Sequence, residues 1–306
     1  MKTNEPVIRT SGLTRYYGKK CVVNQLNLEI PRGLVFGLLG RNGAGKTTVI
    51  RMLLGLLEPT RGGATILGHD CGKLTPEIRE RIGYLAEGHH VYGWMTVREC
   101  GKFQSAFYAN WNDDLFFKIV RHFRLDEGAA AGRLSRGQRA GLCLALTLAP
   151  EPELLVLDDP ALGLDPVARR SLLESIVFVT RGAGRTILFS SHLLSDVERV
   201  ADRIAVIDRG LLKAECTVDQ FRAHVRQFVL NFPGVPPPLP KLPGLLYSFR
   251  TEGEVTATFA NANGIEEQLR KITDDVEETP LGLEDAFIAY VGERGEKTFF
   301  LDNKET

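Results

Sequence analysis

From about residue 7 to residue 216, segments with the hydrophobic pattern of strands alternate with segments that have the pattern of helices. Short apolar runs typical of strands are separated by longer stretches with the period of amphipathic helices. Several of the runs are nearly continuous, as expected of central strands covered on both faces. The strand-like runs cover residues 22–30, 34–39, 64–67, 82–85, 154–157, 186–189 and 204–207. The pattern predicts an α/β domain.

The pattern becomes helical between about residues 90 and 148, and we expect an all-helical lobe over about 88–148. Asn112 or Asp113 can cap a helix near the centre of this region. The apolar residues of that helix form one stripe, which we interpret as packed core rather than a ligand contact. They are Leu115, Phe116, Ile119, Val120 and Phe123. A helical insert of this kind forms a separate lobe that can rotate.

The pattern of hydrophobic and polar residues changes again near residue 217. The elements expected beyond it are strands over 227–232, 245–249 and 254–259 and helices over 265–272 and 283–290. The proline-rich segment 233–244 cannot form a regular element, so we interpret it as a loop between strands. Docking of a polyproline-binding module is the alternative. We therefore predict a first domain over 1–217 and a small α+β domain over 218–306.

Composition and charge argue against several classes of function. The chain has 306 residues, 43% hydrophobic and 25% charged, with 38 basic and 38 acidic side chains. No segment concentrates Lys and Arg, so there is no electrostatic footprint for nucleic acid. The five cysteines include no C-x-x-C pair, which argues against a disulfide framework and a zinc site. The N-terminus has no apolar signal region and the apolar runs are short, so we expect neither a signal peptide nor a membrane span.

A phosphate-binding pattern follows the apolar run 34–39. G-x-x-x-x-G-K-[ST] is matched by Gly40-Arg41-Asn42-Gly43-Ala44-Gly45-Lys46-Thr47. The residues that follow, 48–54, have a helical pattern. A glycine-rich turn between a strand and a helix leaves free backbone N–H groups around an anion-sized hollow. Lys46 can then reach the β- and γ-phosphates, and the Thr47 hydroxyl can bind Mg²⁺.

Polar residues follow two of the later strands. Asp158 ends the apolar run 154–157, where its carboxylate can hold Mg²⁺ directly or through water. Asp159 comes next and is placed to orient an attacking water. His192 follows the run 186–189 and can reach a γ-phosphate from there. Taken alone, each of these groups is commonly a solvated or structural residue at a strand end.

Two further motifs have a structural interpretation, and the first of them has a functional one as well. Ser135-Arg136-Gly137-Gln138 begins a predicted helix with a capping box. The same free N–H groups, hydroxyl and glycine can bind a γ-phosphate. Asp165-Pro166 is explained locally as a helix cap with proline at the first helical position. For residues 135–138, both interpretations stay open at this point.

Taken together and in this order, the motifs resemble those of the nucleotide-binding subunit of ABC transporters. Residues 40–47 are similar to Walker A, 154–158 to Walker B, 134–138 to the LSGGQ signature and 161–165 to the D-loop, while His192 resembles the switch histidine. The amino-acid sequences of residues 33–40 and 163–170 resemble those of the ABC-2-type export ATPases. The resemblance is weak beyond residue 217.

The resemblance implies a fold, cofactors and site residues. The fold is an α/β P-loop NTPase, with a RecA-like core, an antiparallel β subdomain and a helical subdomain, plus a small C-terminal α+β appendage. ATP and Mg²⁺ are the implied cofactors. Catalytic roles fall on Asp159, His192, Lys46 and Glu87, and metal ligation falls on Thr47, Asp158 and Glu87. The implied nucleotide contacts are Tyr17, which stacks on adenine, and Gly40, Asn42, Gly43, Ala44, Gly45, Lys46, Thr47, Thr48, Ser135, Gly137 and Gln138.

The resemblance also implies an assembly. Two such domains pair head to tail, as a homodimer or with a second ABC ATPase subunit, so that each ATP lies between residues 40–47 of one chain and 135–138 of the other. An integral membrane permease binds the lobe that follows Glu87 and holds the pair at the cytoplasmic face of the membrane. No nucleic acid partner is expected. Candidate permease contacts are His89, His90, Tyr92 and Trp94.

Three residues depart from the family pattern. Asp159 replaces the usual Glu and is one methylene shorter; misplacing a catalytic group by about 1 Å can reduce the rate on the order of a hundredfold. We therefore hypothesise slow hydrolysis, or a weak site opposite a more competent paralogue. Arg136 replaces a signature glycine, and Glu87 replaces a Gln whose hydrogen-bond donor it lacks at neutral pH. The alternatives to a transport ATPase are a soluble ABC ATPase acting on DNA or ribosomes, and a regulatory ATP-binding module with slow turnover.

Overall fold

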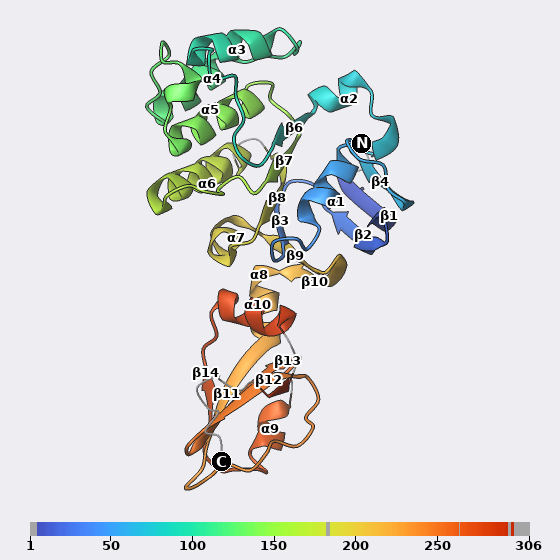
Figure 1. Cartoon of the computed structure of the whole chain (residues 1–306), viewed down its shortest axis with the longest axis vertical. Helices are drawn as coiled ribbons and strands as arrows, with labels where there is room; N and C mark the ends of the chain where they lie inside the picture. The colour runs from blue at the N-terminus through green and yellow to red at the C-terminus, as the bar shows by residue number, and fades with distance from the viewer. Residues whose placement is uncertain (1–4, 182–183, 263, 293–294, 297–306) are drawn as a thin grey trace. The chain divides into compact units, whose positions relative to one another are not determined.

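The computed structural model describes residues 5–181, 184–262, 264–292 and 295–296 (Figure 1). The chain divides into two compact units, Met1–Glu215 and Cys216–Thr306. The first unit contains every motif that the sequence analysis singled out as chemical. Each unit is described by itself below.

A six-stranded sheet with the order β10-β9-β3-β8-β7-β6 forms the centre of the first unit. Its strands are β3 (Val35–Leu39), β6 (Ile82–Leu85), β7 (Leu154–Asp158), β8 (Thr186–Ser191), β9 (Arg203–Asp208) and β10 (Leu211–Thr217). The pairs β6–β7, β7–β8, β8–β3 and β3–β9 are parallel. Every residue of β3, β7 and β8 is buried, which explains why these strands are apolar runs without alternation. The predicted central strands are confirmed, and β10 was not predicted.

A second, antiparallel sheet has the order β2-β1-β4-β5. Its strands are β1 (Ile8–Tyr17), β2 (Lys20–Ile30), β4 (Arg61–Ile66) and β5 (His69–Asp70). Leu28 of β2, Leu38 of β3 and Ile50 of helix α1 (Lys46–Leu53) belong to one buried apolar cluster. The alternating pattern of residues 22–30 therefore marks a strand with one face on this shared core.

The helices that lie between β6 and β7 in the chain form the expected helical lobe (Figure 1). They are α3 (Val97–Ser105), α4 (Asp113–His122) and α5 (Arg136–Leu148), with a short 3₁₀ turn, η2 (Ala131–Arg133). Asn112 caps α4 by accepting a hydrogen bond from the Leu115 N–H at 2.9 Å. Phe116, Ile119 and Val120 are buried, as predicted for the stripe, whereas Leu115 and Phe123 are half-buried.

The remaining helices of the first unit are α2 (Pro76–Glu80), α6 (Pro166–Arg181), α7 (Leu194–Val200) and the 3₁₀ turn η1 (Cys71–Lys73). Of these, η1 and α2 lie between β5 and β6 of the two sheets, whereas α6 and α7 join neighbours in the chain order of the six-stranded sheet. Across the described part of the chain, no helix combines the length and the apolar character needed to cross a membrane.

The second unit contains a five-stranded sheet with the order β14-β11-β13-β12-β15. Its elements are α8 (Val218–His224), β11 (Val225–Asn231), β12 (Leu245–Thr251), β13 (Glu254–Ala260), α9 (Ile265–Leu269), β14 (Val276–Thr279), α10 (Leu283–Val291) and β15 (Gly295–Glu296). The β12–β13 hairpin is confirmed, while α8 and β14 were not predicted. Helix α9 ends earlier than residue 272, because the Thr273 hydroxyl donates to the Asn231 carbonyl at 2.8 Å and holds the following turn.

Candidate nucleotide-binding site

The turn from β3 into α1 contains two glycines, Gly40 and Gly45, at positions that leave no room for a side chain. A Cβ on Gly40 would lie 2.4 Å from the Ile207 carbonyl oxygen, and one on Gly45 would lie 2.7 Å from the Val22 carbonyl oxygen. Gly45 also has φ of 109°, a conformation that glycine adopts without strain. Helix α1 begins directly after it at Lys46, so the N–H groups of its first turn have no partner within the helix. The predicted strand–turn–helix arrangement for anion binding is present.

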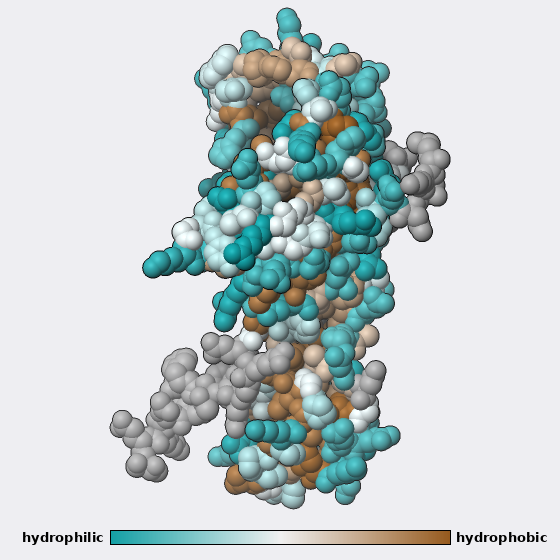
Figure 2. All heavy atoms as spheres, turned by 90° about the vertical axis from the view of Figure 1, so that its right-hand side faces the viewer, coloured by the Kyte–Doolittle hydropathy of each residue, from teal (hydrophilic) through white to brown (hydrophobic). Residues whose placement is uncertain are grey.

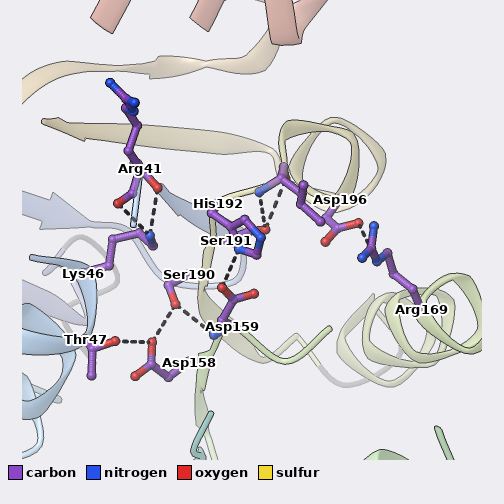
Figure 3. Close-up of polar contacts among 12 residues, drawn as sticks. Arg41, Lys46, Thr47, Asp158, Asp159, Arg169, Ser190, Ser191, His192 and Asp196 are labelled. Carbon is purple, nitrogen blue, oxygen red and sulfur yellow. Dashed lines mark hydrogen bonds and ion pairs between the residues drawn. The ribbon is translucent and has the colours of Figure 1, made fainter. Parts of the chain in front are cut away.

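The Lys46 ammonium is held against the loop itself. Its Nζ donates hydrogen bonds to the carbonyl oxygens of Gly40, at 2.8 Å, and Arg41, at 3.3 Å (Figure 3). Burial lowers the pKa of Lys46, and the nearby carboxylates of Asp159 and Asp158 act in the opposite direction. A buried ammonium with neutral partners gains most from an anion that it can reach. Phosphate oxygens would provide that anion.

The Asp158 carboxylate is buried at the end of β7, with 1% of its surface exposed. Its Oδ1 accepts hydrogen bonds from the Ser190 hydroxyl at 2.7 Å and from the Thr47 hydroxyl at 3.1 Å (Figure 3). Its Oδ2 is buried and has no hydrogen-bond partner among the described residues. An unpartnered buried carboxylate oxygen beside a threonine hydroxyl is the set of hard donors that Mg²⁺ prefers.

Asp159 and His192 form a direct contact beside this carboxylate. His192 Nδ1 and Asp159 Oδ2 are 2.7 Å apart. Asp159 has φ of 45°, and its N–H donates to the Ser190 hydroxyl at 2.9 Å. Ser190 therefore bridges the backbone of Asp159 and the side chain of Asp158. No role was predicted for Ser190, although its place at the end of a buried strand was a usable signal.

A cavity of about 310 Å³ lies over the glycine-rich loop. It is lined by Val22, Asn42, Gly43, Gly45, Lys46, Thr47, Thr48, Glu87, Asp158, Asp159 and Leu162. Most of the predicted phosphate, metal and catalytic residues are thus brought together, and Val22 and Leu162 are additions. No cluster of three or more His, Cys, Asp or Glu side chains suited to a metal occurs in the described ranges. A metal here would need oxygen ligands from the phosphates as well.

Other predicted nucleotide residues are not in this lining. Ala44 is buried and the Gly40 carbonyl binds Lys46. Tyr17 is 46% exposed, and the Arg15 guanidinium lies 4.9 Å from the centre of its ring. Within the described chain, Ser135, Gly137 and Gln138 also lie outside the lining. One chain therefore places its signature residues away from its own phosphate loop.

The signature forms the predicted capping box at the start of α5. The Gln138 N–H donates to the Ser135 hydroxyl at 3.2 Å, and the Ser135 N–H donates to the Gln138 side-chain oxygen at 3.1 Å. A Cβ on Gly137 would lie 2.7 Å from the Cβ of Ala168 on α6, so a glycine is needed for packing as well. The Arg136 guanidinium donates to the Gly163 carbonyl at 3.4 Å.

The start of α6 is explained locally, as predicted. Asp165 Oδ1 accepts hydrogen bonds from the N–H groups of Val167 and Ala168, both at 3.0 Å. Pro166 occupies the first helical position.

In the segment after Glu87, one of the residues predicted to contact a partner is not at the surface. His89 was a candidate contact for a membrane partner, but this prediction is wrong because only 5% of its surface is exposed. Its Nε2 lies 2.8 Å from the Pro160 carbonyl oxygen instead. Tyr92 and Trp94 are 56% and 75% exposed, so they remain available for a partner.

Comparison with known proteins decides the family. A family model described as ABC transporter matches residues 23–162. The bacitracin transport ATP-binding protein BcrA of Bacillus licheniformis is 35% identical over 225 residues, which cover 73% of this chain and 74% of that protein. The Nod factor export ATP-binding protein I of Rhizobium sp. (strain N33) is 33% identical over 300 residues, covering 95% of this chain and 98% of that protein. The chain belongs to the ABC transporter family.

The fold agrees with that assignment. A solved structure of the ATP binding subunit of an ABC transporter superposes with a TM-score of 0.64 at 29% identity, over 71% of this chain and 92% of that one. The predicted P-loop NTPase fold is therefore confirmed for this ABC transporter family member. The cavity over residues 40–47 is lined by residues of the segments that resemble Walker A and Walker B.

His89 gives a pH-dependent contribution to the stability of this ABC transporter family member. Burial lowers the pKa of His89 below its ordinary value of 6.5, and Arg139 and His90 face it with the same effect. The unfolded chain then binds more protons, so the contribution is complete above about pH 6.5 and is lost as the pH falls towards the folded pKa. We expect the free energy of unfolding of the parent, minus that of His89→Gln, to decrease between pH 7.5 and 5.5 in urea titrations. A difference that stays constant over this interval would contradict the prediction.

Proposed function

We propose that the chain binds and hydrolyses ATP as the ATPase subunit of an export transporter, and that it drives a separate membrane permease. The observation that carries the proposal is the meeting of Lys46, Thr47 and Asp158 at one cavity. The named functions of the relatives, bacitracin transport and Nod factor export, support an export role.

The donor set fits Mg²⁺, because Asp158 offers a buried oxygen that lacks a partner in the described chain and Thr47 offers a hydroxyl. Bound there, Mg²⁺ would neutralise charge on the β- and γ-phosphate oxygens. The residues of the chain supply the remaining functions. Lys46 exchanges the carbonyls of Gly40 and Arg41 for phosphate oxygens. Asp159 orients the attacking water, and His192 holds the Asp159 carboxylate through their hydrogen bond.

A second copy of the chain completes the site. The cavity lining contains no residue of the 135–138 signature within the described ranges, although the free N–H groups at the start of α5 suit a γ-phosphate. A head-to-tail pair brings the signature of one chain onto the nucleotide of the other. ATP then joins the two chains, and its hydrolysis releases them. A paralogous ABC ATPase in place of the second copy is the alternative.

We propose that the permease binds an exposed aromatic cluster of the helical lobe. Tyr92, Trp94, Phe103 and Phe107 are 41% to 75% exposed, and the Tyr92 and Phe103 rings are 5.6 Å apart. A groove of about 350 Å³ lies beside them, lined partly by Tyr92, Met95 and Phe103. In Figure 2, apolar side chains gather near the upper end, the region that holds α3 and α4 in Figure 1. Binding of a permease here would hold the chain at the cytoplasmic face of the membrane.

Slow hydrolysis follows from the length of Asp159. Its carboxylate is drawn to His192 at 2.7 Å, and one more methylene would carry the carboxylate further into the cavity. We expect Asp159→Glu to raise the single-turnover rate of ATP hydrolysis by about tenfold to a hundredfold, since catalysis is sensitive to displacements of about 1 Å. Asp159→Asn, which keeps the length and removes the charge, serves as the matched control and should abolish hydrolysis. A rate for Asp159→Glu that is unchanged or slower would count against this account of Asp159.

Binding of ATP depends on Lys46. Loss of a hydrogen bond to a charged phosphate removes about 1.5–3 kcal/mol, so Lys46→Ala should bind ATP at least tenfold more weakly in equilibrium titrations. Lys73→Ala changes an exposed lysine outside the cavity lining and should bind as the parent does. Parental affinity in Lys46→Ala would overturn the proposed function.

A further inference from the structure

Residues 89–95 are held by hydrogen bonds at both ends. At the start, His89 Nε2 lies 2.8 Å from the Pro160 carbonyl oxygen. Towards the end, the Gly132 N–H donates to the Gly93 carbonyl at 2.9 Å, and the Ala131 N–H donates to the Met95 carbonyl at 2.8 Å. This short stretch therefore joins the turn after Asp159 to the helical lobe.

The hydrogen bond of His89 lies in the interior of the protein. A carbonyl oxygen only accepts, so the Nε2 atom of His89 must carry the donated proton. His89 is 5% exposed and has φ of 51°, and Gly88 before it has φ of 90°. A non-glycine residue with such a φ is uncommon. It persists where the surroundings hold it, and such residues cluster at functional sites.

The other end of this hydrogen bond belongs to the catalytic turn. Pro160 is bonded directly to Asp159, which itself has a positive φ of 45°. The Asp159 N–H is held by Ser190 and its carboxylate by His192. A shift of the Pro160 carbonyl is therefore passed through one peptide unit to the carboxylate that faces the nucleotide cavity.

Tyr92 and Trp94 lie between the two attachments and are 56% and 75% exposed. We propose that His89 is a positioning residue that couples this exposed segment to the carboxylate of Asp159. A partner that displaces Tyr92 and Trp94 then changes the position of Asp159. Because coupling is reciprocal, nucleotide in the cavity also changes the surroundings of Trp94. The proposal rests on the proposed function, since it needs ATP at this site.

The test separates the hydrogen bond from the bulk of the side chain. His89→Leu removes the donor, whereas His89→Gln keeps an N–H at a similar reach. The chain has two tryptophans, so a Trp111→Phe background leaves Trp94 as the single fluorescent reporter. We expect Mg-ATP to change the Trp94 emission in this background and in His89→Gln, and to leave it unchanged in His89→Leu. We also expect kcat to fall about tenfold or more in His89→Leu, with KM within about twofold of the parent, as for a misplaced catalytic group.

Controls distinguish coupling from damage to the fold. His69→Leu changes an exposed histidine in β5 and should leave the emission change and kcat unaltered. His89→Phe, a ring without the donor, repeats the test if His89→Leu gives little folded protein. A folded His89→Leu with parental kcat and emission change would overturn the inference, as would a parent that hydrolyses ATP without any change at Trp94. A parent that neither binds nor hydrolyses ATP would instead contradict the proposed function and the inference with it.

Discussion

The buried carboxylate of Asp158 is the constraint on which the rest of the site depends. A charge with 1% of its surface exposed is stable only when it is hydrogen-bonded or faces a cation. The hydroxyls of Thr47 and Ser190 donate hydrogen bonds to one of its oxygens. Thr47 comes from the helix after the phosphate loop, and Ser190 comes from the neighbouring strand. The parallel pairing of β7 with β8 and of β8 with β3 puts these groups at one edge. The other oxygen has no hydrogen-bond partner among the described residues, and for this reason we propose Mg²⁺ as its partner.

The same edge of the sheet supports the proposal that one chain holds half of a nucleotide site. Lys46 and Asp159 line the same cavity as Asp158. The signature begins α5 in the helical lobe, and Ser135 and Gln138 bind each other rather than the loop. The first N–H groups of a helix lack partners within the helix, so the start of α5 is suited to the phosphate of a second chain. In the proposed pair, the helical lobe would pass motion from a permease to this junction.

Much of the site could be predicted from the sequence because its chemistry is local. The glycine spacing before Lys46 and the carboxylate at the end of an apolar run follow from what a strand–turn–helix and a strand end require. Long-range contacts could not be predicted in this way. Ser190 acquires its role from the strand that β8 pairs with, and the interior place of His89 depends on Pro160, which is 71 residues away. Helix α9 ended early for the same reason, since a contact between Thr273 and a distant strand overrode its helical pattern.

The central claim, that each ATP is bound by two chains, is tested most directly by complementation. Lys46→Ala removes the phosphate loop half, and Ser135→Arg blocks the signature half, so each purified variant should fail to hydrolyse ATP. In an equal mixture, half of the dimers pair the two variants and each of these has one intact composite site. The account predicts that the mixture regains about a quarter of the parental ATPase activity, since the site is shared across a symmetric pair. A mixture that stays as inactive as its two components would contradict it.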